Sequence, residues 1–232
     1  MRRVSFVLLL AVPVVACSEP DARIQAAQVN WMEWPAEVTA ATTFTVRLVG
    51  YGVACVEIRQ FVTTPTVDQS AVTFEPYYLL GRPQVCPFDV PRQDRADAPA
   101  LSIAPSFDTS AAVPGLEAQY ARTYEIRAGT DVYARLGLDA LAAYPIRTFG
   151  DITVRAAQVE NGRINAGGTV YASRDSIGCV TLHPSFVYPG YVIENPPADT
   201  AQHWTAFVRG YIYDAPAPVC GASKVFHLVT RN

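Results

Sequence analysis

The sequence has few positive charges and almost no lysine. Lys224 is the only lysine among the 18 basic residues, and the formal net charge of the 232-residue chain is −3. Proteins that bind nucleic acid present a basic face, because they must neutralise phosphate groups. The charge balance therefore argues against a nucleic-acid partner. Charged residues are scarce overall (17%) against 50% hydrophobic residues, so the chain can bury a core of one large or two small domains.

Motifs for nucleophilic, phosphate and calcium chemistry are missing. The chain has no Gly-x-Ser-x-Gly elbow, no glycine-rich phosphate loop and no EF-hand loop. Residues 173–176 form a polar turn before Cys179, with no histidine close in sequence to activate a hydroxyl. Glu57, Asp68 and Glu75 could be nominated as a carboxylate pair, but outward acidic residues on strands usually only add solubility. We predict no catalytic residue, no cofactor and no enzymatic activity.

Histidine is rare, with His183, His203 and His227 as its only occurrences. Three imidazoles suffice for a catalytic zinc, and three strands could bring these together. However, His227 alternates outward from Phe226, and His183 precedes Pro184 in a turn-like stretch. We therefore predict ordinary surface or turn histidines and no metal site.

No apolar run is long enough to span a membrane, which takes about 20 residues. The longest run, residues 6–15, follows Arg2 and Arg3 and ends at Ala16 and Cys17. A short positive start, a brief apolar run and a small-residue end are typical of a secretion signal. Residues 1–16 are predicted to be this signal, and losing its two arginines lowers the net charge of the mature part from −3 to −5.

The stretch Val14-Val15-Ala16-Cys17 resembles the lipobox of bacterial lipoproteins. The resemblance implies that Cys17 is lipidated and becomes the first mature residue, anchored in the membrane by several acyl chains. Ser18 is non-acidic, which in that family goes with the outer membrane. The resemblance thus places the protein in the bacterial cell envelope, facing the periplasm or the surface. The alternative is an ordinary cleaved signal in which Cys17 is incidental.

The remaining cysteines are even in number, which in an exported chain favours disulfides. Cys55, Cys86, Cys179 and Cys220 allow three connectivities, and sequence alone does not choose between them. We predict Cys55–Cys86 and Cys179–Cys220, because each bridge then closes inside one candidate domain. The spacing does not suit zinc, since no two cysteines stand two residues apart.

Short alternating segments separated by turn residues predict an all-β fold. Phe44, Val46 and Leu48 alternate with Thr45 and Arg47, and similar patterns recur near residues 56–59, 123–127, 152–155, 206–212 and 225–229. No long stretch keeps helical spacing, while 18 prolines and 14 glycines supply turns. Residues 17–30 are small and polar, which predicts a flexible tether.

A weak internal repeat suggests two domains, residues 31–155 and 156–232. Thr45-Val46 precedes Cys55-Val56 by the same interval as Thr169-Val170 precedes Cys179-Val180. With their strand count and terminal strands, the copies resemble immunoglobulin-like β-sandwiches of bacterial surface proteins, which implies two such modules in tandem. The first copy carries an insertion, residues 129–146, predicted to cover an open end of the sandwich.

Aromatic residues crowd the second half of the chain. The proline-flanked segment 186–191 is the first place to expect an exposed aromatic patch, with Phe186, Tyr188 and Tyr191 as candidate binding residues. Packing in the core of a small β-domain is the alternative for each of these residues.

These features together predict a lipid-anchored envelope protein that acts as a non-enzymatic structural or binding module. Its partner would be another envelope protein or a glycan. The alternative is a ligand-binding or hydrolytic β-protein whose site is assembled from residues distant in sequence.

Overall fold

A computed structural model describes most of the chain beyond its first 22 residues. Cys17, Cys55, Cys86, Phe186 and Tyr188 lie outside the described residues, as does the predicted Cys55–Cys86 bridge. The described residues are 23–51, 56–83, 106–120, 122–130, 144–160, 162–184, 190–198 and 201–232.

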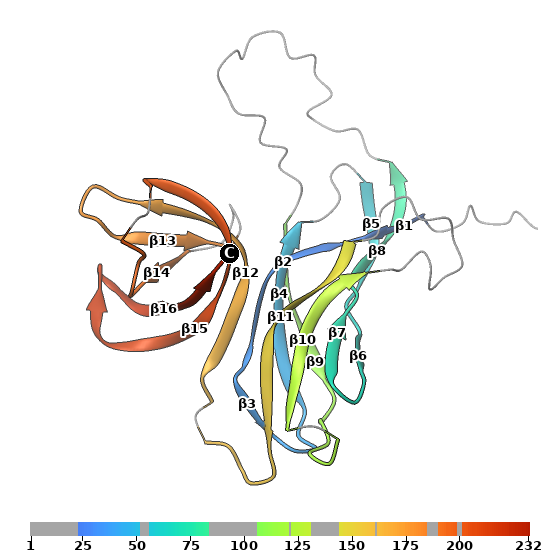
Figure 1. Cartoon of the computed structure of the whole chain (residues 1–232). Coiled ribbons are helices and arrows are strands. Elements are labelled where there is room, and N and C mark those ends of the chain that lie inside the picture. Colours follow the sequence, from blue (N-terminus) through green and yellow to red (C-terminus); the bar gives the residue numbers. More distant parts are fainter. Residues whose placement is uncertain are drawn as a thin grey trace, which may run out of the picture.

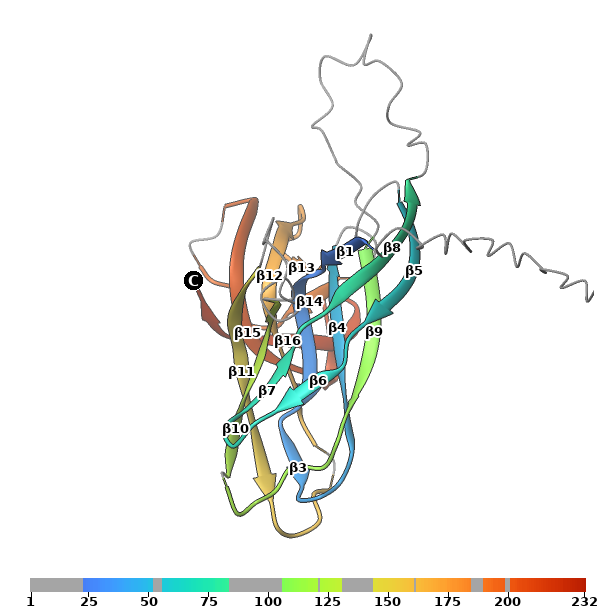
Figure 2. The ribbon, with the colours of Figure 1, turned by 90° about the vertical axis from the view of Figure 1, so that its right-hand side faces the viewer.

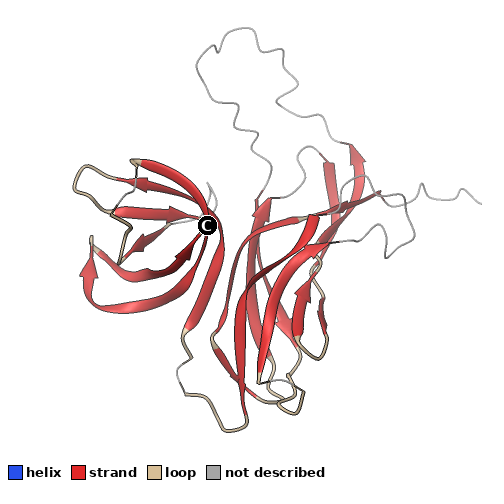
Figure 3. Ribbon diagram, in the orientation of Figure 1, coloured by secondary structure: helices blue, strands red, loops and turns tan. Residues whose placement is uncertain are grey.

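Strands connected by loops make up the whole of this described part, in which Figure 3 shows no helix. The all-β prediction is therefore confirmed. In chain order the strands are β1 (Arg23–Ala26), β2 (Gln28–Pro35), β3 (Glu37–Thr39), β4 (Phe44–Tyr51), β5 (Val56–Val62), β6 (Pro65–Val67), β7 (Ala71–Phe74), β8 (Tyr77–Pro83), β9 (Ser106–Val113), β10 (Thr123–Thr130), β11 (Tyr144–Arg155), β12 (Ile164–Arg174), β13 (Val180–His183), β14 (Tyr191–Ile193), β15 (His203–Val219) and β16 (Ala222–Arg231).

Strand β4 shows how alternation in the sequence becomes burial. Phe44, Val46 and Leu48 are buried, whereas Thr45 between them is exposed. Successive side chains of a strand point to opposite faces, so one face of β4 packs in the core. Val49 lies on the opposite face of β4, with Thr45 and Arg47, and is also buried, because it packs in a second hydrophobic cluster.

The first half of the chain forms a β-sandwich (Figure 1). Strands β2, β4 and β9 belong to an eight-stranded sheet, and they share a hydrophobic core with the five-stranded sheet β3-β11-β10-β7-β6. Trp34, Phe74 and Phe149 fill this core, and each is at most 2% exposed. The indole Nε1 of Trp34 donates a hydrogen bond to the carbonyl of Asp151 at 3.0 Å, which ties the two layers together. A small third sheet, β1-β8-β5, lies at one end of the sandwich (Figure 2).

The second half forms a small closed barrel. Strands β12, β13, β14, β16 and β15 pair in that order, β15 pairs with β12, and β13 pairs back to β12. The β14–β16 contact is parallel and the others are antiparallel. Val170, Leu182, Val208 and Phe226 fill its interior, each at most 1% exposed. Closure removes sheet edges that would otherwise invite aggregation.

A disulfide links two turns at one end of the barrel. The Sγ atoms of Cys179 and Cys220 are 1.92 Å apart, and their Cα atoms are 6.1 Å apart. This is the second of the two bridges predicted from the sequence. Cys220 and Gly221 connect β15 to β16 with φ angles of 51° and 78°. Positive φ at both central residues suits a tight two-residue hairpin, and glycine adopts it without steric cost.

The sandwich and the barrel share one continuous sheet. Strand β2 pairs with β12, from Pro35 opposite Ile164 to Trp31 opposite Gly168. This pairing crosses the predicted domain boundary between residues 155 and 156. The finer prediction of two immunoglobulin-like sandwiches in tandem is not confirmed, because the second half closes into a barrel. Strand β12 is long enough to belong to both halves, because it pairs with β2 along its first half and with β13 along its second. The two halves are therefore not separate sandwiches.

Gly168 permits the close approach of these two strands. Its φ is +149°, and a Cβ atom there would lie 1.9 Å from the carbonyl oxygen of Asn30. Any other residue would push β12 away from β2, so glycine is required at this position.

Residues 23–30 are not the flexible tether that was predicted for residues 17–30. Residues 23–26 form β1, and β2 begins at Gln28. Ala26 and Ala27 are at most 4% exposed. Small residues, which suggested a flexible linker, here pack in two small clusters beside β8.

The internal repeat has only partial structural counterparts. Strand β12 pairs with the following β13, whereas β4 and the following β5 belong to different sheets. The last strand pairs of the two copies, β10–β11 and β15–β16, are more alike. A short strand pairs in parallel with the second strand of each, β3 with β11 and β14 with β16. Most of the predicted insertion lies in residues 131–143, outside the described ranges.

Candidate functional site

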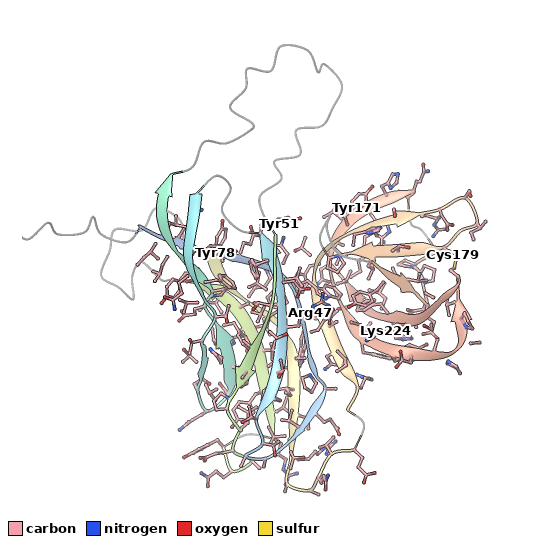
Figure 4. All side chains as sticks on the ribbon, turned by 180° about the vertical axis from the view of Figure 1, so that it is seen from behind. Arg47, Tyr51, Tyr78, Tyr171, Cys179 and Lys224 are labelled. Carbon is pink, nitrogen blue, oxygen red and sulfur yellow. A yellow bond between two sulfur atoms is a disulfide. The ribbon has the colours of Figure 1, made fainter. Side chains whose placement is uncertain are left out.

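Two cavities lie where the sandwich meets the barrel, on either side of Pro184, which lines both. Figure 4 shows Arg47 and Tyr51 on the sandwich side of this junction and Tyr171 and Lys224 on the barrel side. We call the cavity beside Arg47 and Lys224 the charged cavity, and the cavity beside Tyr51 and Tyr171 the neutral cavity. Each is assembled from residues far apart in the sequence.

The charged cavity has a volume of about 290 Å³ and is organised by Arg47. The Arg47 guanidinium donates to both carboxylate oxygens of Asp108, at 2.8 and 2.6 Å, and to Oε1 of Glu33 at 3.0 Å. The hydrogen bonds to Asp108 raise the pKa of Arg47 above its usual range, and the charge of Glu33 adds to the effect. Arg47 is thus held by two carboxylates of its own chain. Lys224, exposed at the rim, is the other cation lining this cavity among the described residues.

Glu33 joins the sandwich to the barrel. Its Oε1 also accepts hydrogen bonds from the Trp31 indole at 2.9 Å and from the Tyr191 hydroxyl at 2.6 Å. The Trp31 ring is fully buried, stacks on Tyr191 at 6.1 Å and packs on Phe226 at 5.6 Å between ring centroids. Burial, reinforced by the Glu33 charge, raises the pKa of Tyr191, so this hydroxyl remains a donor. These contacts hold the junction together.

Tyr191 is the one residue of the predicted aromatic patch that the structure describes. It is half-buried, with its ring on Trp31 and its hydroxyl on Glu33. It does line the charged cavity. Its predicted partners Phe186 and Tyr188 lie outside the described residues.

The neutral cavity has a volume of about 270 Å³, and no charged side chain lines it among the described residues. Amides, hydroxyls and aromatic rings supply its polar groups. Its lining residues are Gln28, Asn30, Tyr51, Thr169, Val170, Tyr171, His183, Pro184 and Thr205.

Asn30 is the most distinctive residue of this cavity. It occupies a β-bulge, because the register of β2 against β4 shifts between Val29 and Trp31. Bulges redirect a side chain out of the regular alternation. Asn30 is 7% exposed, and its side-chain amide has no hydrogen-bond partner among the described residues. None of its side-chain atoms is sealed from solvent without a partner, so the amide reaches the cavity.

Two of the three histidines meet at Tyr171. The Tyr171 hydroxyl is hydrogen bonded to Nδ1 of His203 at 2.8 Å, and the two rings stack at 5.7 Å. The His183 ring lies 6.1 Å from Tyr171, and its Nε2 is 3.1 Å from Oγ of Ser173. Burial lowers the pKa of His183, which favours the neutral ring. The sequence did not indicate this clustering, because cross-strand pairing brings these residues together.

The other nominated groups are separate from the cavities. His227 contacts Glu194 at 2.7 Å and lines neither cavity. Asp68 accepts hydrogen bonds from the backbone N–H groups of Ser70 and Ala71, both at 2.7 Å, and these bonds lower its pKa. Asp68 therefore stabilises a turn. Glu75 lines neither cavity.

No protein family, no curated protein and no solved structure matches this chain. In the part of the chain that the structure describes, no three His, Cys, Asp or Glu side chains gather as a metal site. Nor does that part contain a helix long and apolar enough to cross a bilayer. The two cavities are consequently the structural features that bear on function.

Proposed function

We propose that this protein is a lipid-anchored component of the bacterial cell envelope that binds a ligand at the junction of its sandwich and barrel, without catalysis. The observation that carries the binding role is the neutral cavity, in which the nearly buried amide of Asn30 has no hydrogen-bond partner among the described residues. Polar groups at this depth normally bond to protein or to ordered water, and a ligand that enters the cavity can take the place of the water. The residues that line this cavity are far apart in the sequence, from Gln28 to Thr205. This agrees with the alternative predicted from the sequence, a ligand-binding β-protein whose site is assembled from distant residues.

The architecture supports a binding role. The lipid on Cys17 would fix the protein to the outer membrane, and the few residues before β1 would be the tether. The first half would be the immunoglobulin-like module. Five-stranded Greek-key barrels of the OB type bind oligosaccharides or oligonucleotides on their outer face, an analogy of architecture alone. The net negative charge makes nucleic acid the less suitable of the two.

The anchor is tested by Cys17→Ala, with Ser18→Ala as the matched control. We expect the Cys17→Ala protein to leave the membrane fraction, while the Ser18→Ala protein stays in it. Retention of both proteins would rule out the lipid anchor.

The binding role is tested with the soluble chain that begins at residue 18. Isolated bacterial envelopes should retain it saturably, because a specific site has limited capacity. Linear, non-saturable retention would contradict a specific binding role.

A second candidate, hydrolysis, is favoured by the Ser173–His183 contact at 3.1 Å. A neutral histidine can accept a proton from a serine hydroxyl, but a third group normally orients the histidine. No carboxylate lines the neutral cavity beside His183 among the described residues. A fluorophosphonate probe should therefore leave Ser173 unlabelled. Labelling that is lost in Ser173→Ala and in His183→Ala would favour hydrolysis.

A further inference from the structure

We infer that the neutral cavity is a binding site for one uncharged sugar unit of a glycan, a proposal that rests on the ligand-binding role above. The cavity's size, its charge and its polar groups each point to this ligand class. The three arguments use different observations.

The size of the cavity suits a single small ring. Its volume of about 270 Å³ is just below the range of about 300–1,000 Å³ that is typical of small-molecule sites. A folded protein partner would instead need a broad surface, since stable interfaces bury about 800 Å² on each side. The cavity can therefore hold one unit at the end or along the side of a longer chain.

The charge of the cavity selects against ions. Each described polar group that lines it is an amide, a hydroxyl, a phenol or an imidazole. The lowered pKa of His183 keeps that imidazole neutral near pH 7. A carboxylate, phosphate or ammonium ligand would lose its hydration without gaining an opposite charge, which is costly. The charged cavity on the other side of Pro184 differs in this respect, because the charged side chains of Glu33, Arg47 and Lys224 line it.

The polar groups of the cavity match a polyhydroxylated ligand. The amides of Gln28 and Asn30 each offer both donors and an acceptor, and the hydroxyl of Thr205 can do either. The Thr169 hydroxyl accepts a hydrogen bond from Nη1 of Arg147 at 3.4 Å and can still donate to a ligand. A sugar hydroxyl also donates and accepts, so paired amide and hydroxyl contacts satisfy it. Asn30 would gain most, because its amide lies nine-tenths buried with no partner among the described residues.

Aromatic rings complete the site. Tyr51 comes from the sandwich and Tyr171 from the barrel, on the two sides of the junction in Figure 4. A sugar ring has an apolar C–H face that packs on aromatic rings, and tyrosine combines such a ring with a polar hydroxyl. Tyr171 is fixed by its hydrogen bond to His203 at 2.8 Å, so its ring is preorganised.

The experiment measures binding of the soluble chain to an array of oligosaccharides ending in glucose, galactose, mannose, N-acetylglucosamine or glucuronic acid. The strongest neutral binder is then titrated calorimetrically against variants. Asn30→Ala removes the unpartnered amide, and Thr205→Trp fills the cavity from an exposed strand position. Thr230→Trp, at an exposed threonine on β16 outside the cavity, is the matched control. Unfolding midpoints establish that each variant is folded.

We expect binding to at least one neutral sugar and none to the glucuronic acid oligosaccharide. Asn30→Ala and Thr205→Trp should each weaken binding by about tenfold or more, because a hydrogen bond or the cavity is lost, while Thr230→Trp should bind as the native chain does. If Asn30→Ala fails to fold, Thr205→Trp decides the outcome alone. The inference is overturned by no binding to any neutral sugar, by preference for the acidic sugar, or by unchanged binding of folded Thr205→Trp.

Failure of this inference is distinguishable from failure of the proposed function. The chain could bind no sugar and still be retained saturably on envelopes, with the retention lost after the envelopes are treated with protease. That outcome would overturn the sugar site and leave the binding role intact. If the chain shows neither envelope retention nor sugar binding, both proposals are overturned.

Discussion

Trp31 is the residue on which the contact between the two halves most depends. It lies on a sandwich strand, yet its fully buried ring packs in the barrel core against Phe226 and Tyr191. A large aromatic side chain at such a position contributes both burial and shape. The sandwich thereby supplies part of the barrel's interior.

Trp31→Ala should lower the free energy of unfolding by about 3–5 kcal/mol, because it leaves a cavity between the two halves. Urea denaturation followed by circular dichroism measures this change. Ile177→Ala is the control, since Ile177 is 80% exposed, and it should change the free energy by less than about 0.5 kcal/mol. Equal effects of the two substitutions would show that Trp31 is not a packing centre.

His183 should make stability fall at acidic pH. Burial lowers its pKa in the folded state below the unfolded value of about 6.5. The unfolded chain then binds more protons, so this contribution to stability is full above pH 6.5 and is lost as pH falls through the lower, folded pKa. Unfolding midpoints at pH 7.5 and 5.5 should differ less for His183→Asn than for the native chain. His203→Asn is the control, because His203 is exposed, and an equal reduction in both variants would contradict this role.

At the residue scale, the sequence predicts those features that depend only on residues close together in the chain, such as which face of a strand is buried. The alternation of Phe44, Val46 and Leu48 correctly indicated the buried face of their strand. The bulge at Asn30 and the contact of Trp31 with Tyr191 could not be predicted, because both depend on pairing between strands far apart in the chain.

At the level of elements, the β15–β16 hairpin and the turn before β13 are joined by the Cys179–Cys220 disulfide. The bridge closes a segment of the chain with a sequence separation of 41. Cross-linking a loop of this length reduces the entropy of the unfolded chain, which stabilises the fold.

Replacing Cys179 and Cys220 together by serine should therefore cost about 4 kcal/mol of stability in the chain-entropy estimate. Urea denaturation without reductant measures the loss. Replacing both cysteines avoids leaving a reactive thiol. An unchanged urea midpoint would mean that the unfolded chain is already constrained at this loop.

Element pairing is also where prediction from sequence was weakest. The bridge itself was predicted, because it closes inside one candidate domain. The pairing of β2 with β12 was not, since strand order depends on which surfaces fit and not on local pattern. Gly168 permits the close approach of these two strands, but a glycine in the sequence does not indicate which strand lies opposite it.

At the scale of the whole molecule, the sandwich and the barrel should behave as one unit. Their contact combines backbone pairing of β2 with β12, the buried Trp31 and the hydrogen bonds of Glu33. The chain connection between them, residues 156–160, is mostly exposed and has no strand. The connection is thus the part of the junction that contributes least.

Cutting this connection should leave the protein assembled. A protease recognition sequence inserted after Glu160 would allow cleavage in the native state. We expect the two fragments to elute together in gel filtration, at the volume of the uncut protein, and to separate only in denaturant. Separation under native conditions would show that the two halves are held together only by the chain.

The position of Lys224 has a practical consequence. It carries the only side-chain amine of the sequence, and it lies exposed at the rim of the charged cavity. An amine-reactive fluorophore would therefore attach beside the junction at a single side chain, without any engineered cysteine to disturb the Cys179–Cys220 disulfide. Such a label would report changes at the junction in the native chain by its emission alone.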